Sequence, residues 1–209
     1  RAPNTVLGPR SSVTVPPVSA AAVGVGARTS AAKSDDIVAN RMYLEPELHC
    51  FMSGVPHNMW TQFGQQIFQT KDYLMIAWEF QHSRRIIPLD GRPHDNVPQW
   101  MGDSRGHWEG DTLVVRVTDQ NDQTWLDAAG NFHSAELTVV ERYTMTDPNT
   151  IRYDATLTDP KVFSRPWTIH LQIARRTDRT RLFEYQCQAE AEEASGAFER
   201  DPKTWYPGR

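Results

Sequence analysis

The chain has 209 residues, a formal net charge of −4 and two cysteines. This length suits one ordinary domain with its own hydrophobic core, and the mildly negative charge argues against nucleic acid as a general partner. No apolar run approaches the ~20 residues that a membrane-spanning helix needs, and two cysteines are too few for a disulfide-dense scaffold or an all-thiolate zinc site.

The composition of the chain changes near residue 40. Residues 1–40 contain four basic and two acidic side chains and no aromatic side chain. A segment without aromatics cannot bury enough apolar surface to fold alone. We therefore expect an extended or disordered N-terminal arm over residues 1–40 and a folded domain over residues 41–209. Alternatively, Ser12–Val18 and Ala20–Val25 lie along a sheet edge or a neighbouring subunit.

The rest of the chain is dominated by the two-residue alternation of β-strands. Short turn sequences separate the strands, and no long amphipathic helix intervenes, which argues against βαβ architectures. We expect an all-β, antiparallel up-and-down meander, favour a lipocalin-like β-barrel and keep a β-sandwich as the alternative. The predicted strands are Gln66–Thr70, Tyr73–Phe80, Arg84–Leu89, His107–Glu109, Asp111–Val117, Leu137–Met145, Thr150–Leu157, Trp167–Arg175 and Arg181–Gln188.

Three irregular regions accompany the strands. The loops 91–105 and 119–133 are long enough to be functional and are expected to cover one mouth of the barrel. An irregular C-terminal tail is expected from about residue 189, with a short helix over 189–197.

Several segments carry a resemblance to known proteins: LDGRPH at 89–94, WMGDSRGHWEGDTLVV at 100–115, NDQTWLD at 121–127 and RPWT at 165–168. They resemble a large family of exported, β-rich bacterial proteins that has no established activity. The similarity runs roughly from Cys50 to Cys187 and leaves residues 1–40 outside. It implies a β-rich domain and export to the periplasm or the extracellular space, and it carries over no catalytic residue.

Cys50 and Cys187 lie near opposite ends of the expected domain. In an exported protein they are expected to form one disulfide that ties the start of the domain to its last strand. The alternative is two buried free thiols, because cysteine is often buried as a small apolar residue.

The sequence predicts neither a metal nor a nucleotide cofactor. Its seven histidines form no His-x-His or His-x3-His pair, so zinc would have to collect ligands from separate loops. Asp119-x-Asn121-x-Gln123 begins like a calcium loop, but Gly130 stands where such a loop ends in glutamate. No phosphate loop or dinucleotide fingerprint is present.

Strand alternation places two polar residues on apolar faces. Glu141 shares a face with Leu137, Val139 and Tyr143, and His82 ends an apolar stripe that begins at Leu74. A carboxyl group and an imidazole aimed into a barrel could exchange protons with a substrate. Alternatively, Glu141 pairs with an arginine such as Arg85 or Arg152 and only fixes the fold.

These observations lead to a functional hypothesis, a cofactor-independent acid–base enzyme of the isomerase, cyclase, lyase or hydrolase type. Its substrate would be a small, largely apolar or aromatic organic molecule bound in the barrel. The expected catalytic residues are His82, Glu141, His94 and Asp103, and the expected substrate-binding residues are Arg85, Arg92, Trp100, His107, Trp125 and Tyr143. The alternatives are a non-catalytic small-molecule carrier, and an accessory subunit that docks on a partner or on another copy through residues 1–40.

Overall fold

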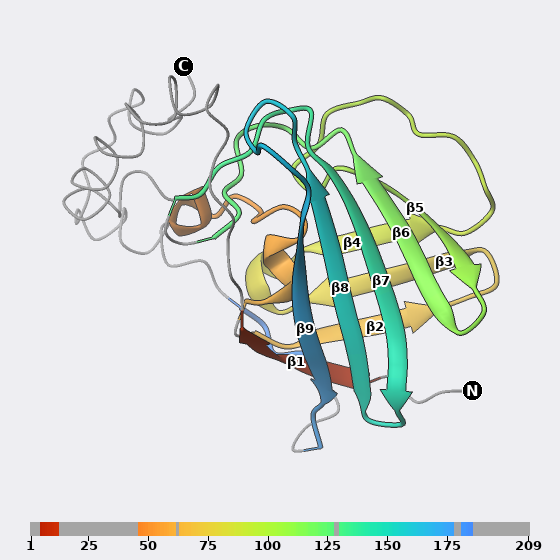
Figure 1. Ribbon diagram of the computed structural model, residues 1–209. Coiled ribbons are helices and arrows are strands. Elements are labelled where there is room, and N and C mark those ends of the chain that lie inside the picture. Colours follow the sequence, from red (N-terminus) through yellow and green to blue (C-terminus); the bar gives the residue numbers. More distant parts are fainter. Residues whose placement is uncertain (1–4, 13–45, 62, 128–129, 178–180, 186–209) are drawn as a thin grey trace, which may run out of the picture.

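The structure, a computed structural model, describes residues 5–12, 46–61, 63–127, 130–177 and 181–185. Within these residues the chain forms nine β-strands and three short 3-10 helices, and it has no α-helix (Figure 1). The strands are β1 Thr5–Ser12, β2 Gln65–Gln69, β3 Tyr73–Trp78, β4 Arg84–Pro88, β5 Asp103–Glu109, β6 Thr112–Thr118, β7 Thr138–Asp147, β8 Thr150–Thr158 and β9 Trp167–Arg175. The 3-10 helices are η1 Pro46–His49, η2 His57–Met59 and η3 Phe80–His82.

All strands belong to one antiparallel sheet in the order β4-β3-β2-β1-β9-β8-β7-β6-β5. In Figure 1, β2, β3 and β4 lie behind β6, β7 and β8, so the sheet curves until its two ends face each other. The expected all-β antiparallel fold is confirmed. Among the described strands no hydrogen-bonded ladder joins β4 to β5, so no closed barrel forms there, and the choice between barrel and sandwich stays a prediction.

The core lies between the facing parts of the sheet and follows the two-residue period of the strands. In β9, for example, Ile169, Leu171 and Ile173 are buried, while His170 and Gln172 are exposed. A side chain of every second residue points to the same face of a strand. The apolar alternation in the sequence therefore places the core correctly.

Two of the observed strand boundaries that differ from the predicted ones lie next to residues with positive φ angles. β3 ends at Trp78 rather than Phe80, and Gln81 and His82 have φ of 55° and 49°. β5 begins at Asp103 rather than His107, directly after Gly102 with φ of 62°. Left-handed backbone interrupts a strand, and for non-glycine residues it is poorly marked in a sequence.

The predicted strand Arg181–Gln188 is wrong for its described part. Residues 181–185 form no strand, and the backbone N–H of Phe183 donates to the Glu79 carboxylate (2.7 Å) instead of to a neighbouring strand. Residues from 186 onward, including the expected helix over 189–197 and the C-terminal tail, lie outside the described residues.

The first strand comes from the segment assigned to the N-terminal arm. β1 lies between β2 and β9 and pairs antiparallel with both, with Pro9 opposite Ile173. The sequence did not predict β1 because residues 1–40 contain no aromatic side chain, and Pro9 is a residue seldom found inside a sheet. Residues 13–40, which contain most of Ser12–Val18 and all of Ala20–Val25, lie outside the described residues.

Two further observations complete the fold. Cys50 is not a free thiol, but Cys187 lies outside the described residues, so their pairing stays a prediction.

Within the part of the chain that is described, no helix is long and apolar enough to cross a membrane.

Candidate functional site

A buried ion pair crosses the interior of the protein. Arg85 in β4 donates two parallel hydrogen bonds to the carboxylate of Glu141 in β7, one of them from Nη1 to Oε1 at 3.0 Å. The two side chains are only 2% and 0% exposed. Because β4 and β7 belong to the facing parts of the sheet, this bidentate pair joins them through the core.

Neighbouring hydroxyl groups complete the ion pair. Tyr143 and Tyr153 donate to Oε1 of Glu141 at 2.9 Å and 2.8 Å, and Arg85 donates from Nε to Ser104 Oγ at 2.7 Å. Burial, together with the nearby carboxylate, raises the pKa of both tyrosines well above the usual value. Burial opposes the charge of Arg85, but Glu141 and the two tyrosines together outweigh it, so the pKa of the guanidinium is raised.

The position of Glu141 on the apolar face is therefore as predicted, but its contacts match the structural alternative. Each carboxylate oxygen already accepts a hydrogen bond from Arg85, and Tyr143 donates to the same group instead of facing a substrate. A fully buried carboxylate with these protein partners stabilises the fold and does not face a substrate.

The expected partnership of His82 with Glu141 is wrong. His82 is exposed and lies in η3, where its backbone is left-handed, whereas Glu141 is fully buried in β7. The apolar stripe of β3 stops at Trp78, so the alternation that placed His82 inside does not extend to it.

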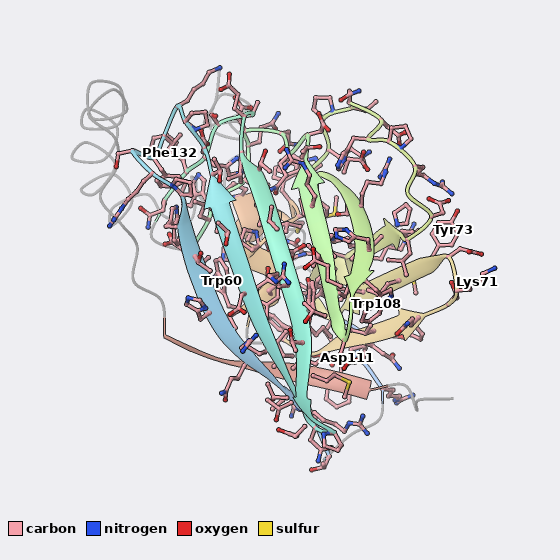
Figure 2. All side chains as sticks on the ribbon, turned by 45° about the vertical axis from the view of Figure 1, so that its right-hand side comes forward. Trp60, Lys71, Tyr73, Trp108, Asp111 and Phe132 are labelled. Atoms are coloured by element: carbon pink, nitrogen blue, oxygen red, sulfur yellow. The ribbon has the colours of Figure 1, made fainter. Side chains whose placement is uncertain are left out.

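The other predicted substrate-binding residues do not gather at one place. Arg92 is held outside by Asp90 and by the hydroxyl of Tyr73, which Figure 2 shows at the β2–β3 turn. His107 is exposed beside Glu109 at 3.2 Å. Trp125 is buried and accepts a hydrogen bond through its carbonyl oxygen from a core histidine, His57.

Apart from the group around Glu141, two predicted residues come together, His94 and Asp103. Nδ1 of His94 lies 3.2 Å from Oδ2 of Asp103, and the two side chains are 22% and 8% exposed. The other ring nitrogen, Nε2, has no hydrogen bond to any described residue. A histidine with one nitrogen on a buried carboxylate and the other unoccupied has the arrangement of an oriented general base.

The carboxylate of Asp103 is itself fixed. Arg105 forms an ion pair with Oδ1, and the backbone N–H of Asp95 donates to Oδ2 at 2.8 Å. Arg105 also donates from Nε to the carbonyl oxygen of Pro93 at 2.8 Å. These bonds tie the loop between β4 and β5, drawn yellow-green at the upper right of Figure 1, to the start of β5.

A second carboxylate approaches the same histidine from β6. The hydroxyl of Thr118 lies 3.1 Å from Nδ1 of His94 and donates to Oδ2 of Asp119 at 2.5 Å. Asp119 directly follows β6, and its carbonyl oxygen accepts a hydrogen bond from the backbone N–H of Gln99 at 2.9 Å. In the described residues, His94, Asp103 and Asp119 form the one group that could hold a metal ion, with ligand atoms within 4.8 Å of one another.

Sequence reasoning missed Asp119, but the hairpin contains the necessary signal. The turn Gly110-Asp111 fixes the register of β5 against β6, and counting back from it pairs Asp103 with Thr118. Asp119 therefore follows the residue that stands directly opposite Asp103. Testing the segment only as a calcium loop ignored this pairing across strands.

Comparison of the chain with protein-family models, curated proteins and solved structures found no match. The fold and the site thus define an all-β antiparallel protein in which one histidine and two carboxylates lie close together.

Proposed function

We propose that the protein is an acid–base enzyme in which His94 transfers the proton and Asp103 positions the imidazole. The observation that carries the proposal is the contact between Nδ1 of His94 and the buried, fixed carboxylate of Asp103, with Nε2 left without a described partner. This assignment keeps the cofactor-independent chemistry that the sequence suggested, and it replaces His82 and Glu141 as the reacting pair.

The proposed chemistry follows from the two ring nitrogens. Asp103 accepts a hydrogen bond from Nδ1–H, which leaves the lone pair of a neutral imidazole on Nε2. Nε2 can then take a proton from a substrate and return it at another atom, or activate a water molecule. Isomerases, cyclases, lyases and hydrolases all use such a step, so the geometry supports this reaction class as a whole.

An aromatic stack that includes Trp100, three residues before Asp103, supports a small apolar or aromatic substrate. The rings of Trp100 and Phe51 stack with centroids 4.8 Å apart and planes within 6° of each other, and both are half-buried. Trp100 lies in the tight turn closed by a hydrogen bond from Gly102 N–H to the carbonyl oxygen of Gln99. Stacking on such a platform favours flat, apolar molecules. Export to the periplasm or outside the cell remains part of the proposal.

The proposal is tested with 5-nitrobenzisoxazole, a small aromatic compound whose ring opens when a base removes one proton. We expect His94→Gln to lower kcat/KM by about 100-fold, the usual contribution of a general base. The matched control is His82→Gln, because His82 is an exposed histidine that precedes β4, whereas His94 lies in the loop that follows β4. Equal rates for the two variants would exclude His94 as the base.

Asp103→Asn tests the positioning role separately. An amide can hold the ring but no longer favours Nδ1–H, so we expect a lower kcat and an altered pH profile while circular dichroism stays unchanged. An unchanged pH profile would show that Asp103 is only structural.

The carrier hypothesis rests on the Trp100–Phe51 stack alone, because stacking needs no proton transfer. It predicts that the same compound quenches tryptophan fluorescence but is not converted. Binding without turnover in the unsubstituted protein would favour the carrier over the enzyme.

A further inference from the structure

We infer that His94, Asp103 and Asp119 form a binding site for a divalent transition-metal ion of the Zn²⁺ type, and that this ion switches off the proposed base. The inference rests on the proposed function for its regulatory part, while the metal site itself stands on geometry alone.

The three ligand groups converge from separate parts of the chain. Asp103 is the first residue of β5, Asp119 directly follows β6, and His94 lies in the loop between β4 and β5. Their ligand atoms lie within 4.8 Å of one another, and one pair, Nδ1 of His94 and Oδ2 of Asp103, is already at 3.2 Å. Ligands bonded at ~2.0–2.2 Å in a tetrahedral site lie about 3.3–3.6 Å apart, so the nearest pair is already close enough and side-chain rotation has to bring in the third ligand.

The surrounding bonds orient the ligands as an outer shell does in metal sites. Arg105 forms an ion pair with Oδ1 of Asp103, which leaves Oδ2 directed at His94. The hydroxyl of Thr118 contacts Nδ1 of His94 and donates to Oδ2 of Asp119, so it bridges the imidazole and the second carboxylate. Such outer contacts fix ligand orientation and typically change affinity by about 10- to 100-fold when removed.

The ligand types decide which ion fits. One imidazole nitrogen with two carboxylate oxygens suits Zn²⁺ and related first-row ions, whereas Ca²⁺ and Mg²⁺ prefer oxygen ligands alone and more of them. Three protein ligands also leave room for water on the ion. We therefore expect Zn²⁺ to bind and Mg²⁺ and Ca²⁺ to bind far more weakly.

The ion and the base exclude each other because they need different tautomers of His94. A metal ion takes the lone pair of Nδ1, so the imidazole proton has to reside on Nε2. Nε2 then lacks the lone pair that accepts the substrate proton. No bond to a substrate and no electron transfer is involved, since the proton only moves from one ring nitrogen to the other through solvent.

The site is tested by calorimetric titration of the full chain, freed of metal with a chelator that is then removed, with ZnCl₂, MgCl₂ and CaCl₂. We expect one Zn²⁺ per chain, and at least about tenfold weaker binding in Asp119→Asn. The matched control is Asp122→Asn, which changes an exposed aspartate three residues further along the same loop. Equal Zn²⁺ affinity in the two variants would overturn the site.

A second arm separates this inference from the proposed function. Turnover of 5-nitrobenzisoxazole is measured with EDTA and with Zn²⁺, and we expect Zn²⁺ to inhibit the unsubstituted protein at concentrations that hardly affect Asp119→Asn. If calorimetry shows Zn²⁺ binding but the metal-free protein in EDTA shows no turnover, the proposed enzyme is refuted and the metal site is kept. Turnover in EDTA that Zn²⁺ leaves unchanged would refute the regulation but keep the enzyme.

Discussion

At the residue scale, the two carboxylates that the sequence marked as catalytic have different roles. Glu141 is fully buried and engaged by Arg85, Tyr143 and Tyr153. Asp103 is also largely buried, but it contacts His94, a partly buried histidine whose Nε2 has no hydrogen bond to a described residue. Burial alone does not identify a catalytic group, because the partners of the carboxylate determine whether it can act.

The structural role of Glu141 leads to a prediction about stability. Glu141→Gln leaves the guanidinium of Arg85 buried without a counter-charge, and breaking one partner of a buried ion pair typically costs about 3–5 kcal/mol. We expect a loss of that size in the free energy of unfolding, measured by urea denaturation with circular dichroism.

Tyr153→Phe is the matched control for this variant. It removes one hydrogen bond to the same carboxylate but keeps the ion pair, so we expect a smaller loss of about 1.5–3 kcal/mol. A loss in Glu141→Gln no larger than in Tyr153→Phe would contradict the role assigned to the ion pair.

At the scale of elements, the sequence predicts strands well where apolar and polar residues alternate and fails where aromatic residues are lacking or a left-handed residue intervenes. The alternation placed β7, β8 and β9 within one or two residues of their observed bounds. β1 was missed because its segment contains no aromatic residue, and the left-handed backbone at Gln81 and His82 ended β3 early. Such conformations depend on the surrounding fold more than on local composition.

The place of β1 predicts what removal of the N-terminus does. β1 bridges β2 and β9, so a chain without residues 1–12 leaves both strands with an unpaired edge. We expect a loss of at least ~3 kcal/mol in the free energy of unfolding, from several ladder hydrogen bonds at ~0.5–1.5 kcal/mol each, and faster amide hydrogen exchange in β9.

A chain without residues 1–4, which precede β1, serves as the control. The accessory-subunit hypothesis makes the opposite prediction, because a docking arm can be removed without destabilising the domain. Equal stability of both shortened chains, with assembly lost only from the chain without residues 1–12, would favour that hypothesis over a structural strand.

At the scale of the whole molecule, the fold brings together groups that are distant in sequence. Arg85 and Glu141 close the core between facing parts of the sheet, and the β5–β6 hairpin places Asp119 beside Asp103. The sequence indicated His94 and Asp103, because both lie in one short polar loop. It could not decide between Arg85 and Arg152 as the partner of Glu141, because that choice depends on how the sheet curves.

The most direct test of the account is the protonation of His94 in the intact, metal-free protein. Two-dimensional ¹H–¹⁵N correlation spectra of the imidazole at pH 9, assigned with His94→Gln, report which ring nitrogen carries the proton. We predict the proton on Nδ1 and an unprotonated Nε2, with Asp103→Asn shifting the population toward Nε2–H. A proton on Nε2 in the unsubstituted protein would contradict the proposal that Asp103 orients His94 as a base.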